Sequence, residues 1–207
     1  MNKMLNVFRM LAQSLLLFVA FSFAMTAQAN EEAETLVKSV SDKVLQILND
    51  NKETYLSDPD SLFSLIETEV MPFIDFSTMA KLTLIKHWKA ATEEQRTQFS
   101  EAYKNMLIRT YTESFDKYTG ARLEVLGSDA RREGYVSVKC EVLPGNLPVE
   151  YDLRQVDGTW KAYDMTFEGV SMIKNYRNSF DREIEQSGLE ALIQRLQNGD
   201  DVTEVKS

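Results

Sequence analysis

The sequence predicts an α+β fold in which helices pack on a curved, four-stranded antiparallel sheet and enclose an apolar cavity. Apolar residues recur at helical spacing as far as residue 118, alternate with polar residues over 122–167, and return to helical spacing after Gly169. Helices, then a meander of strands, then more helices are typical of α+β domains. One face of the predicted sheet is too apolar to face water, so helices must cover it. A curved sheet wrapped in this way forms a cone with a hollow interior.

Residues 1–29 predict a secretory signal peptide. Lys3 and Arg9 form a basic start, an uncharged apolar run follows, and Ala27-Gln28-Ala29 is an A-x-A cleavage site. An uncleaved membrane anchor is the alternative, but the apolar run is short for a membrane span. We therefore expect an exported mature chain that begins at Asn30.

The mature chain is acidic and of single-domain size. Without Lys3 and Arg9, 21 of the 23 basic residues remain against 32 acidic residues, which is a net charge of −11. This balance argues against binding to nucleic acid or to an anionic bilayer surface. We expect one domain over 30–198, long enough to bury a core, and a disordered tail over 199–207.

Capping signals mark the starts of the predicted helices in the first half of the chain. The first helix, over 31–49, carries one continuous apolar stripe. Asp58-Pro59 combines an N-cap with a proline at the first helical position, and Pro72 should end that second helix near Met71. Asp75 is the expected cap of a third helix.

The longest predicted helix begins at a capping box, Thr92-Glu93-Glu94-Gln95. It should span roughly 92–118, and Gly120 should end it. Its apolar arc is broad, which indicates burial against more than one element.

Four strands and two helices account for the rest of the chain. Turn signals at Pro144-Gly145-Asn146 and Asp157-Gly158 predict an antiparallel meander. After Gly169 a helix is expected, and Gly188 separates it from a last amphipathic helix. The strands are expected at 122–125, 136–142, 149–154 and 160–167.

Residues able to carry chemistry are scarce. The single histidine, His87, and the single cysteine, Cys140, cannot supply a zinc site or an internal disulfide. Asp164, a carboxylate in an apolar strand, is the candidate general base of a cavity enzyme acting on a small apolar substrate. The alternative is a structural role as a cap or as an acceptor of backbone N–H groups. We favour the structural role because no second acid, base or oxyanion donor accompanies Asp164.

Two stretches of the chain resemble a known family. Trp160-Lys161-Ala162-Tyr163-Asp164-Met165, followed by Glu168-Gly169-Val170-Ser171-Met172-Ile173, resembles the signature of the MlaC family, the periplasmic phospholipid-binding or toluene-tolerance proteins of Gram-negative bacteria. The block from Trp88 to Phe99 is similar to a second conserved block. The resemblance covers roughly 33–197. It leads us to expect a glycine where this chain has Ile85.

The resemblance implies an NTF2-like cone and a non-enzymatic carrier without a resident cofactor, whose cargo is phospholipid. The implied partners are an outer-membrane lipoprotein–porin complex and an inner-membrane ABC transporter complex. Moving phospholipid between them in the periplasm would maintain the lipid asymmetry of the outer membrane.

Inward strand positions and the helical positions that face them are the predicted tail-binding residues. On the last strand we place Tyr163 and Met165, rather than Trp160 and Ala162, at the cavity. Lys174 and Arg177 are the predicted rim beside the lipid phosphate. The predicted tail-binding residues are Phe76, Met106, Thr110, Phe115, Val138, Tyr151, Leu153, Tyr163, Met165, Met172, Ile173 and Tyr176.

Overall fold

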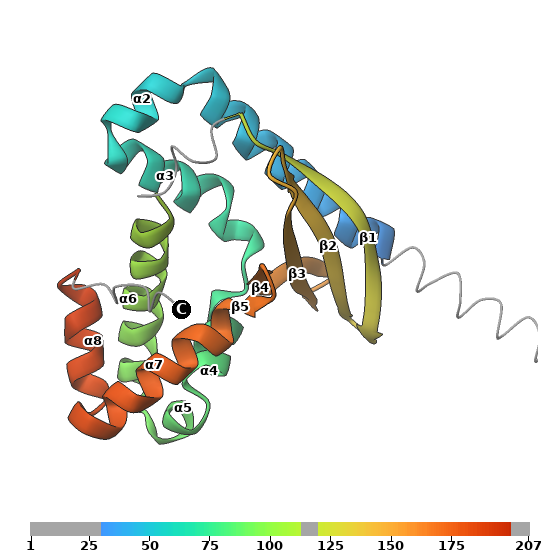
Figure 1. The fold of residues 1–207 in the computed structure, drawn as a ribbon. Coiled ribbons are helices and arrows are strands. Elements are labelled where there is room, and N and C mark those ends of the chain that lie inside the picture. Colours follow the sequence, from blue (N-terminus) through green and yellow to red (C-terminus); the bar gives the residue numbers. More distant parts are fainter. Residues whose placement is uncertain (1–29, 113–119, 200–207) are drawn as a thin grey trace, which may run out of the picture.

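The computed structural model describes residues 30–112 and 120–199. They form an antiparallel sheet, a long N-terminal helix over residues 30–50 that runs along the sheet, and a lobe of helices beside it (Figure 1). Within these ranges no helix is long and apolar enough to cross a membrane. The other helices are α2 (Lys52–Ser57), α3 (Pro59–Glu69), the 3-10 helix η1 (Met71–Phe73), α4 (Phe76–Leu84), α5 (Lys86–Ala90), α6 (Glu93–Thr112), α7 (Met172–Ser187) and α8 (Leu189–Gln197). The strands are β1 (Arg122–Arg132), β2 (Tyr135–Leu143), β3 (Leu147–Val156), β4 (Thr159–Phe167) and β5 (Val170–Ser171).

The sheet has five strands in the order β1-β2-β3-β4-β5, each antiparallel to the next. The prediction of four strands is therefore wrong by the two-residue strand β5. Glu168 and Gly169 have φ angles of 49° and 84°, a left-handed turn that glycine adopts at no steric cost. This turn reverses the chain so that β5 pairs with Thr166 and Phe167.

A bulge in β4 decides which of its side chains share the apolar face of the sheet. Ala162 pairs with Leu153 of β3 and Met165 pairs with Tyr151, so Tyr163 is an extra residue in β4. Because residues paired across two strands lie on the same face, Ala162 and Met165 share that face. The predicted alternation, which placed Tyr163 with Met165 and excluded Ala162, is therefore wrong.

The N-terminal helix covers the apolar face of the sheet. Its residues Ala33 and Val37 are buried in one cluster with the inward side chains of β1 to β4, among them Val136, Val138 and Leu153. This cluster forms the core of the sheet side of the molecule.

The helical lobe has an apolar core of its own, centred on Tyr103 of α6. The centroid of the Tyr103 ring lies 5.4 to 5.5 Å from those of Phe76, Phe99, Tyr176 and Phe180. Such edge-on and stacked contacts are the preferred geometry of buried aromatic pairs. The broad apolar arc predicted for this helix thus packs against α4, α7 and α8.

The predicted helix caps are confirmed. Asp58 accepts hydrogen bonds from the first turn of α3, and Asp75 accepts one from the first turn of α4. Thr92 and Gln95 form the two reciprocal bonds of the capping box, each of 3.1 Å. The predicted extension of α6 to residue 118 lies outside the described residues.

Two polar connections join the helical lobe to the sheet. At the first, the Asp75 N–H donates to the Ala162 carbonyl over 2.7 Å, and the Asp75 carboxylate pairs with Arg154 of β3. At the second, the Asp164 carboxylate accepts a 2.6 Å hydrogen bond from Ser171, the N-cap of α7. Both connections involve β4, so this strand is the seam between the two parts of the fold.

Candidate binding cavity

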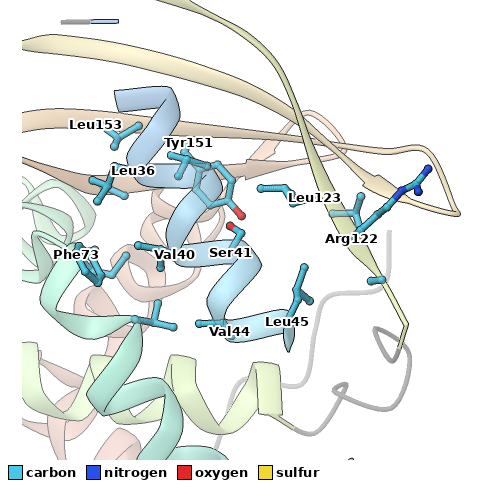
Figure 2. A pocket seen from close by; sticks show the side chains of 16 residues that line it. Leu36, Val40, Ser41, Val44, Leu45, Phe73, Arg122, Leu123, Tyr151 and Leu153 are labelled. Atoms are coloured by element: carbon cyan, nitrogen blue, oxygen red, sulfur yellow. The ribbon is translucent and has the colours of Figure 1, made fainter. Parts of the chain in front are cut away.

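An apolar cavity of about 270 Å³ lies between the N-terminal helix and the apolar face of the sheet, and the segment around η1 closes one side (Figure 2). Thirteen of its sixteen lining residues are apolar. The lining consists of Leu36, Val37, Val40, Ser41, Val44 and Leu45 from the helix; Val70, Phe73 and Ile74 from the η1 segment; and Ala121, Arg122, Leu123, Val142, Tyr151, Leu153 and Ala162 from the sheet and its approach.

The two walls follow from the two periodicities of the sequence. On the helix, Leu36, Val40 and Val44 are four residues apart, so they lie on one face, and Figure 2 shows Val40 on the same side of the helix as Phe73. On β3, Tyr151 and Leu153 are two residues apart and point to the same side. Val70, Phe73 and Ile74 of the η1 segment close one side of the space between these two walls.

Three lining residues carry polar groups: Ser41, Arg122 and Tyr151. Burial raises the pKa of the Tyr151 phenol well above its ordinary value of 10, so the hydroxyl stays protonated and can donate a hydrogen bond at neutral pH. Arg122 is the only exposed residue of the lining and marks an opening to solvent. Figure 2 shows its guanidinium directed away from the other lining side chains.

Of the twelve predicted tail-binding residues, the structure brings Tyr151 and Leu153 to this cavity. Val138 pairs with Tyr151 and is buried in the same cluster, but it does not line the cavity. Met165 also pairs with Tyr151 and therefore lies on the same face of the sheet as Tyr151. Thr110 is half-buried on α6, and Phe115 lies outside the described residues. The others pack in or against the core of the helical lobe: Phe76, Met106, Tyr163, Met172, Ile173 and Tyr176.

The predicted rim residues also lie away from the cavity lining. Lys174 is exposed on α7. Arg177 directs its guanidinium at the carbonyl of Leu82 and donates two hydrogen bonds of 3.1 and 2.7 Å, which fasten α7 to α4.

The N-terminal helix supplies more of the lining than any other element, and sequence reasoning missed it as a cavity wall. The available signal was its uninterrupted apolar stripe over 31–49, which is longer than one neighbouring helix needs. The stripe predicts burial of the helix correctly. It does not show whether the helix packs on the sheet or on other helices.

The contacts of Asp164 and Cys140 indicate structural roles for both residues. Asp164 pairs with Asp152 on the sheet face opposite Tyr151, so its carboxylate does not reach the cavity. Its oxygens accept hydrogen bonds from Ser171 and from the backbone N–H groups of Met165 and Ile173. Burial raises the pKa of the Cys140 thiol to about 12, which keeps it in the unreactive protonated form.

Comparison with known proteins identifies similar chains over most of the length. The family model described as "MlaC protein" matches residues 38–198. A curated relative from Haemophilus influenzae, the "Intermembrane phospholipid transport system binding protein MlaC", is 20% identical over 193 residues, 89% of this chain and 90% of the relative. The "Toluene tolerance protein ttg2D" of Pseudomonas putida is 26% identical over 177 residues, 84% of this chain and 82% of the relative.

A solved structure shares the fold. It is a phospholipid-binding protein from Ralstonia solanacearum in complex with a phospholipid, with a TM-score of 0.75 and 24% sequence identity. The match covers 82% of this chain and 97% of the Ralstonia chain. An α+β fold of helices on an antiparallel sheet is therefore shared by the two proteins.

Proposed function

Because the chain belongs to the MlaC family, we propose that it is a phospholipid carrier that holds the acyl chains of its cargo between the N-terminal helix and the sheet. The observation that carries this proposal is the cavity itself. Its walls are apolar, and its only exposed lining residue, Arg122, stands at one end. This arrangement can enclose the tails of a lipid while the headgroup stays in water.

The hydrophobic effect requires a carrier to keep the acyl chains of its cargo out of water. Two acyl chains contain roughly 30 methylene groups, and each contributes about 0.8 kcal/mol when it leaves water. Free diffusion of such a lipid through water would therefore cost more than ~20 kcal/mol. A carrier removes this cost by enclosing the tails. The headgroup keeps its hydration, so the protein does not need to recognise its identity.

Loading must enlarge the cavity. A volume of about 270 Å³ is near the lower limit of small-molecule pockets, and a two-chain lipid is larger than a typical small-molecule ligand. The N-terminal helix is the element suited to move, because its lining side chains make no hydrogen bonds across the cavity to residues of 30–112 or 120–199. In the loaded state, the sheet and the helices would form the NTF2-like cone that the family resemblance implies.

The carrier would work in the periplasm between two membrane complexes. We propose that it exchanges phospholipid with an outer-membrane lipoprotein–porin complex and an inner-membrane ABC transporter complex, and so maintains the lipid asymmetry of the outer membrane. The name of the Haemophilus relative supports a role in intermembrane phospholipid transport. The predicted signal peptide supports export of the chain.

The decisive experiment is a mass spectrum of the lipids bound to the protein after it is purified from the periplasmic fraction of its native cells. We expect about one co-purifying phospholipid per chain or a small multiple, and uptake of phospholipid from vesicles. Val40→Trp, which fills the cavity, should abolish most of both. Met172→Trp in the helical lobe is the matched control and should retain them, because Met172 packs against the other core.

Absence of lipid together with absence of uptake would refute the proposed function. Loss of lipid in a folded Met172→Trp variant, with retention in Val40→Trp, would instead move the tail site into the helical lobe, where most of the predicted residues lie.

A further inference from the structure

Two hydroxyl groups interrupt the apolar lining of the cavity. Ser41 comes from the N-terminal helix and Tyr151 from β3, on opposite walls. Figure 2 shows both hydroxyl oxygens directed to the same middle part of the cavity. Neither side chain makes a hydrogen bond with any residue of the ranges 30–112 and 120–199.

Both residues are half-buried, and each hydroxyl lies among apolar side chains, so it is free to donate a hydrogen bond to a ligand that enters the cavity. The Tyr151 phenol is protonated at neutral pH because burial raises its pKa, so it can donate a hydrogen bond to an acceptor on a bound ligand. The acyl chains of a lipid offer no acceptor. The carbonyl oxygens of the ester groups that join the acyl chains to glycerol are acceptors.

We propose that Ser41 and Tyr151 donate hydrogen bonds to the ester carbonyl groups of a diacyl glycerophospholipid. This inference rests on the proposed carrier function. The two hydrogen bonds would fix how deeply the lipid sits, with the junction of its tails and headgroup at the middle of the cavity. The tails then extend toward Leu36 and Leu153, and the glycerophosphate extends toward the opening at Arg122 (Figure 2).

The consequence is selectivity for the linkage rather than for the headgroup. A diether phospholipid has the same tails and the same phosphate but lacks both carbonyl oxygens. The carrier should therefore prefer the diester by about tenfold, because two neutral hydrogen bonds of about threefold each are lost with the diether. The headgroup, which lies in water, should change this ratio little.

The test is a competition for the full mature chain. The protein is incubated with vesicles that contain equal amounts of diester and diether phosphatidylethanolamine with matched chains, and the bound lipids are quantified by mass spectrometry. The wild type should carry about ten diester molecules for each diether molecule. Tyr151→Phe and Ser41→Ala should each lower the ratio to about three, because each variant keeps one of the two hydrogen bonds.

Ser39→Ala is the matched control on the same helix. Its hydroxyl is exposed and donates to the Leu36 carbonyl over 3.0 Å, outside the cavity lining, so the ratio should stay at the wild-type value. Circular dichroism identifies any variant that does not fold, and the Ser41 and Tyr151 substitutions test the same ratio independently.

The outcomes separate the inference from the proposed function. Equal uptake of diester and diether lipid by the wild type would overturn the ester-binding role and leave the carrier function intact. A diester preference unchanged in both folded variants would also overturn it. No uptake of either lipid would overturn the inference and the proposed function together.

Discussion

Asp164 of β4 and Ser171 at the start of α7 are joined by a hydrogen bond of 2.6 Å from the serine hydroxyl to the carboxylate. The other carboxylate oxygen accepts the backbone N–H of Ile173 over 3.1 Å, and Ser171 in turn accepts the N–H of Lys174 over 3.2 Å. One carboxylate therefore fixes the direction in which α7 leaves the sheet. The left-handed residue Gly169 makes this sharp corner possible.

Removal of this carboxylate should destabilise the corner strongly. Asp164→Ala leaves the buried Ser171 hydroxyl and two backbone N–H groups without their acceptor, and hydrogen bonds to a charged group contribute about 1.5–3 kcal/mol each. We expect the free energy of unfolding in urea to fall by about 3 kcal/mol. The exposed Asp129→Ala variant, which loses only an ion pair with Lys139, should match the wild type within error. A loss for Asp164→Ala no larger than that of Asp129→Ala would contradict the fastening role.

The ion pair between Asp75 and Arg154 should make stability depend on pH in a defined direction. Burial alone would raise the pKa of Asp75, but hydrogen bonds from Thr78 and the Arg154 guanidinium outweigh it and hold the pKa below its ordinary value of 3.8. A lowered carboxylate pKa stabilises the folded state above pH 3.8, and this stability is lost as the pH falls through the folded-state value.

Asp75→Asn tests this directly, because asparagine can still cap α4 but carries no charge for Arg154. At pH 7 the variant should lose roughly 2 kcal/mol of unfolding free energy. The difference from the wild type should shrink once the pH falls below about 3.8. Asp42→Asn, from an exposed pair with Lys38, should show no such narrowing. A gap between wild type and Asp75→Asn that is constant down to pH 2 would rule the electrostatic account out.

Ile85 is held in a strained backbone conformation. It connects α4 to α5 with φ 42° and ψ −96°, and its branched side chain is 46% exposed. A β-branched residue at positive φ costs of order 1–3 kcal/mol, whereas glycine adopts it freely. The glycine that the family resemblance leads us to expect at this position therefore has a physical reason.

Ile85→Gly should stabilise the protein by about 1 kcal/mol, because relief of strain exceeds the entropy that glycine adds to the unfolded chain. Thermal and urea unfolding measure this gain. Ala90→Gly, an exposed position in the neighbouring helix α5, should lose about 1 kcal/mol. Destabilisation by both glycines would show that Ile85 is not strained in solution.

Single hydrogen bonds hold the two ends of the N-terminal helix to the β1 side of the cavity. Ser128 donates to Glu34 over 2.5 Å, and the Gly120 N–H donates to Asn49 over 3.1 Å. If this helix moves when lipid loads, Ser128→Ala should speed transfer of labelled phosphatidylethanolamine from loaded protein to acceptor vesicles by about three- to tenfold.

Lys38→Ala provides the control for that measurement, because Lys38 lies on the same helix and forms an exposed ion pair with Asp42. Its transfer rate should equal that of the wild type. Equal rates for Ser128→Ala and Lys38→Ala would mean that lipid enters without release of this end of the helix.

Much of the fold was predictable from local signals. The caps at Asp58, Asp75 and Thr92, and the breaks at Gly169 and Gly188, are short-range features, because each satisfies backbone groups within a few residues. The α+β order and the meander follow from the change of period along the chain.

The candidate site was predictable only in part. Tyr151 and Leu153 were found because strand alternation selects one face of β3. Met106 and Tyr176 satisfy the same apolar criterion but pack around Tyr103 in the helical lobe. Periodicity states that a side chain is buried. It does not state which of two apolar cores buries it.

The sequence by itself therefore determined the longer helices and the four long strands, their order, the caps at Asp58, Asp75 and Thr92, and the family. Only the tertiary structure decided that the N-terminal helix forms one wall of the cavity, that Tyr163 is a bulge residue, and that two hydroxyl groups share the apolar interior. The physical reason is the sequence separation over which each kind of signal acts. Helix and strand signals act over a few residues, whereas Ser41 and Tyr151 are 110 positions apart and meet only when the helix docks on the sheet.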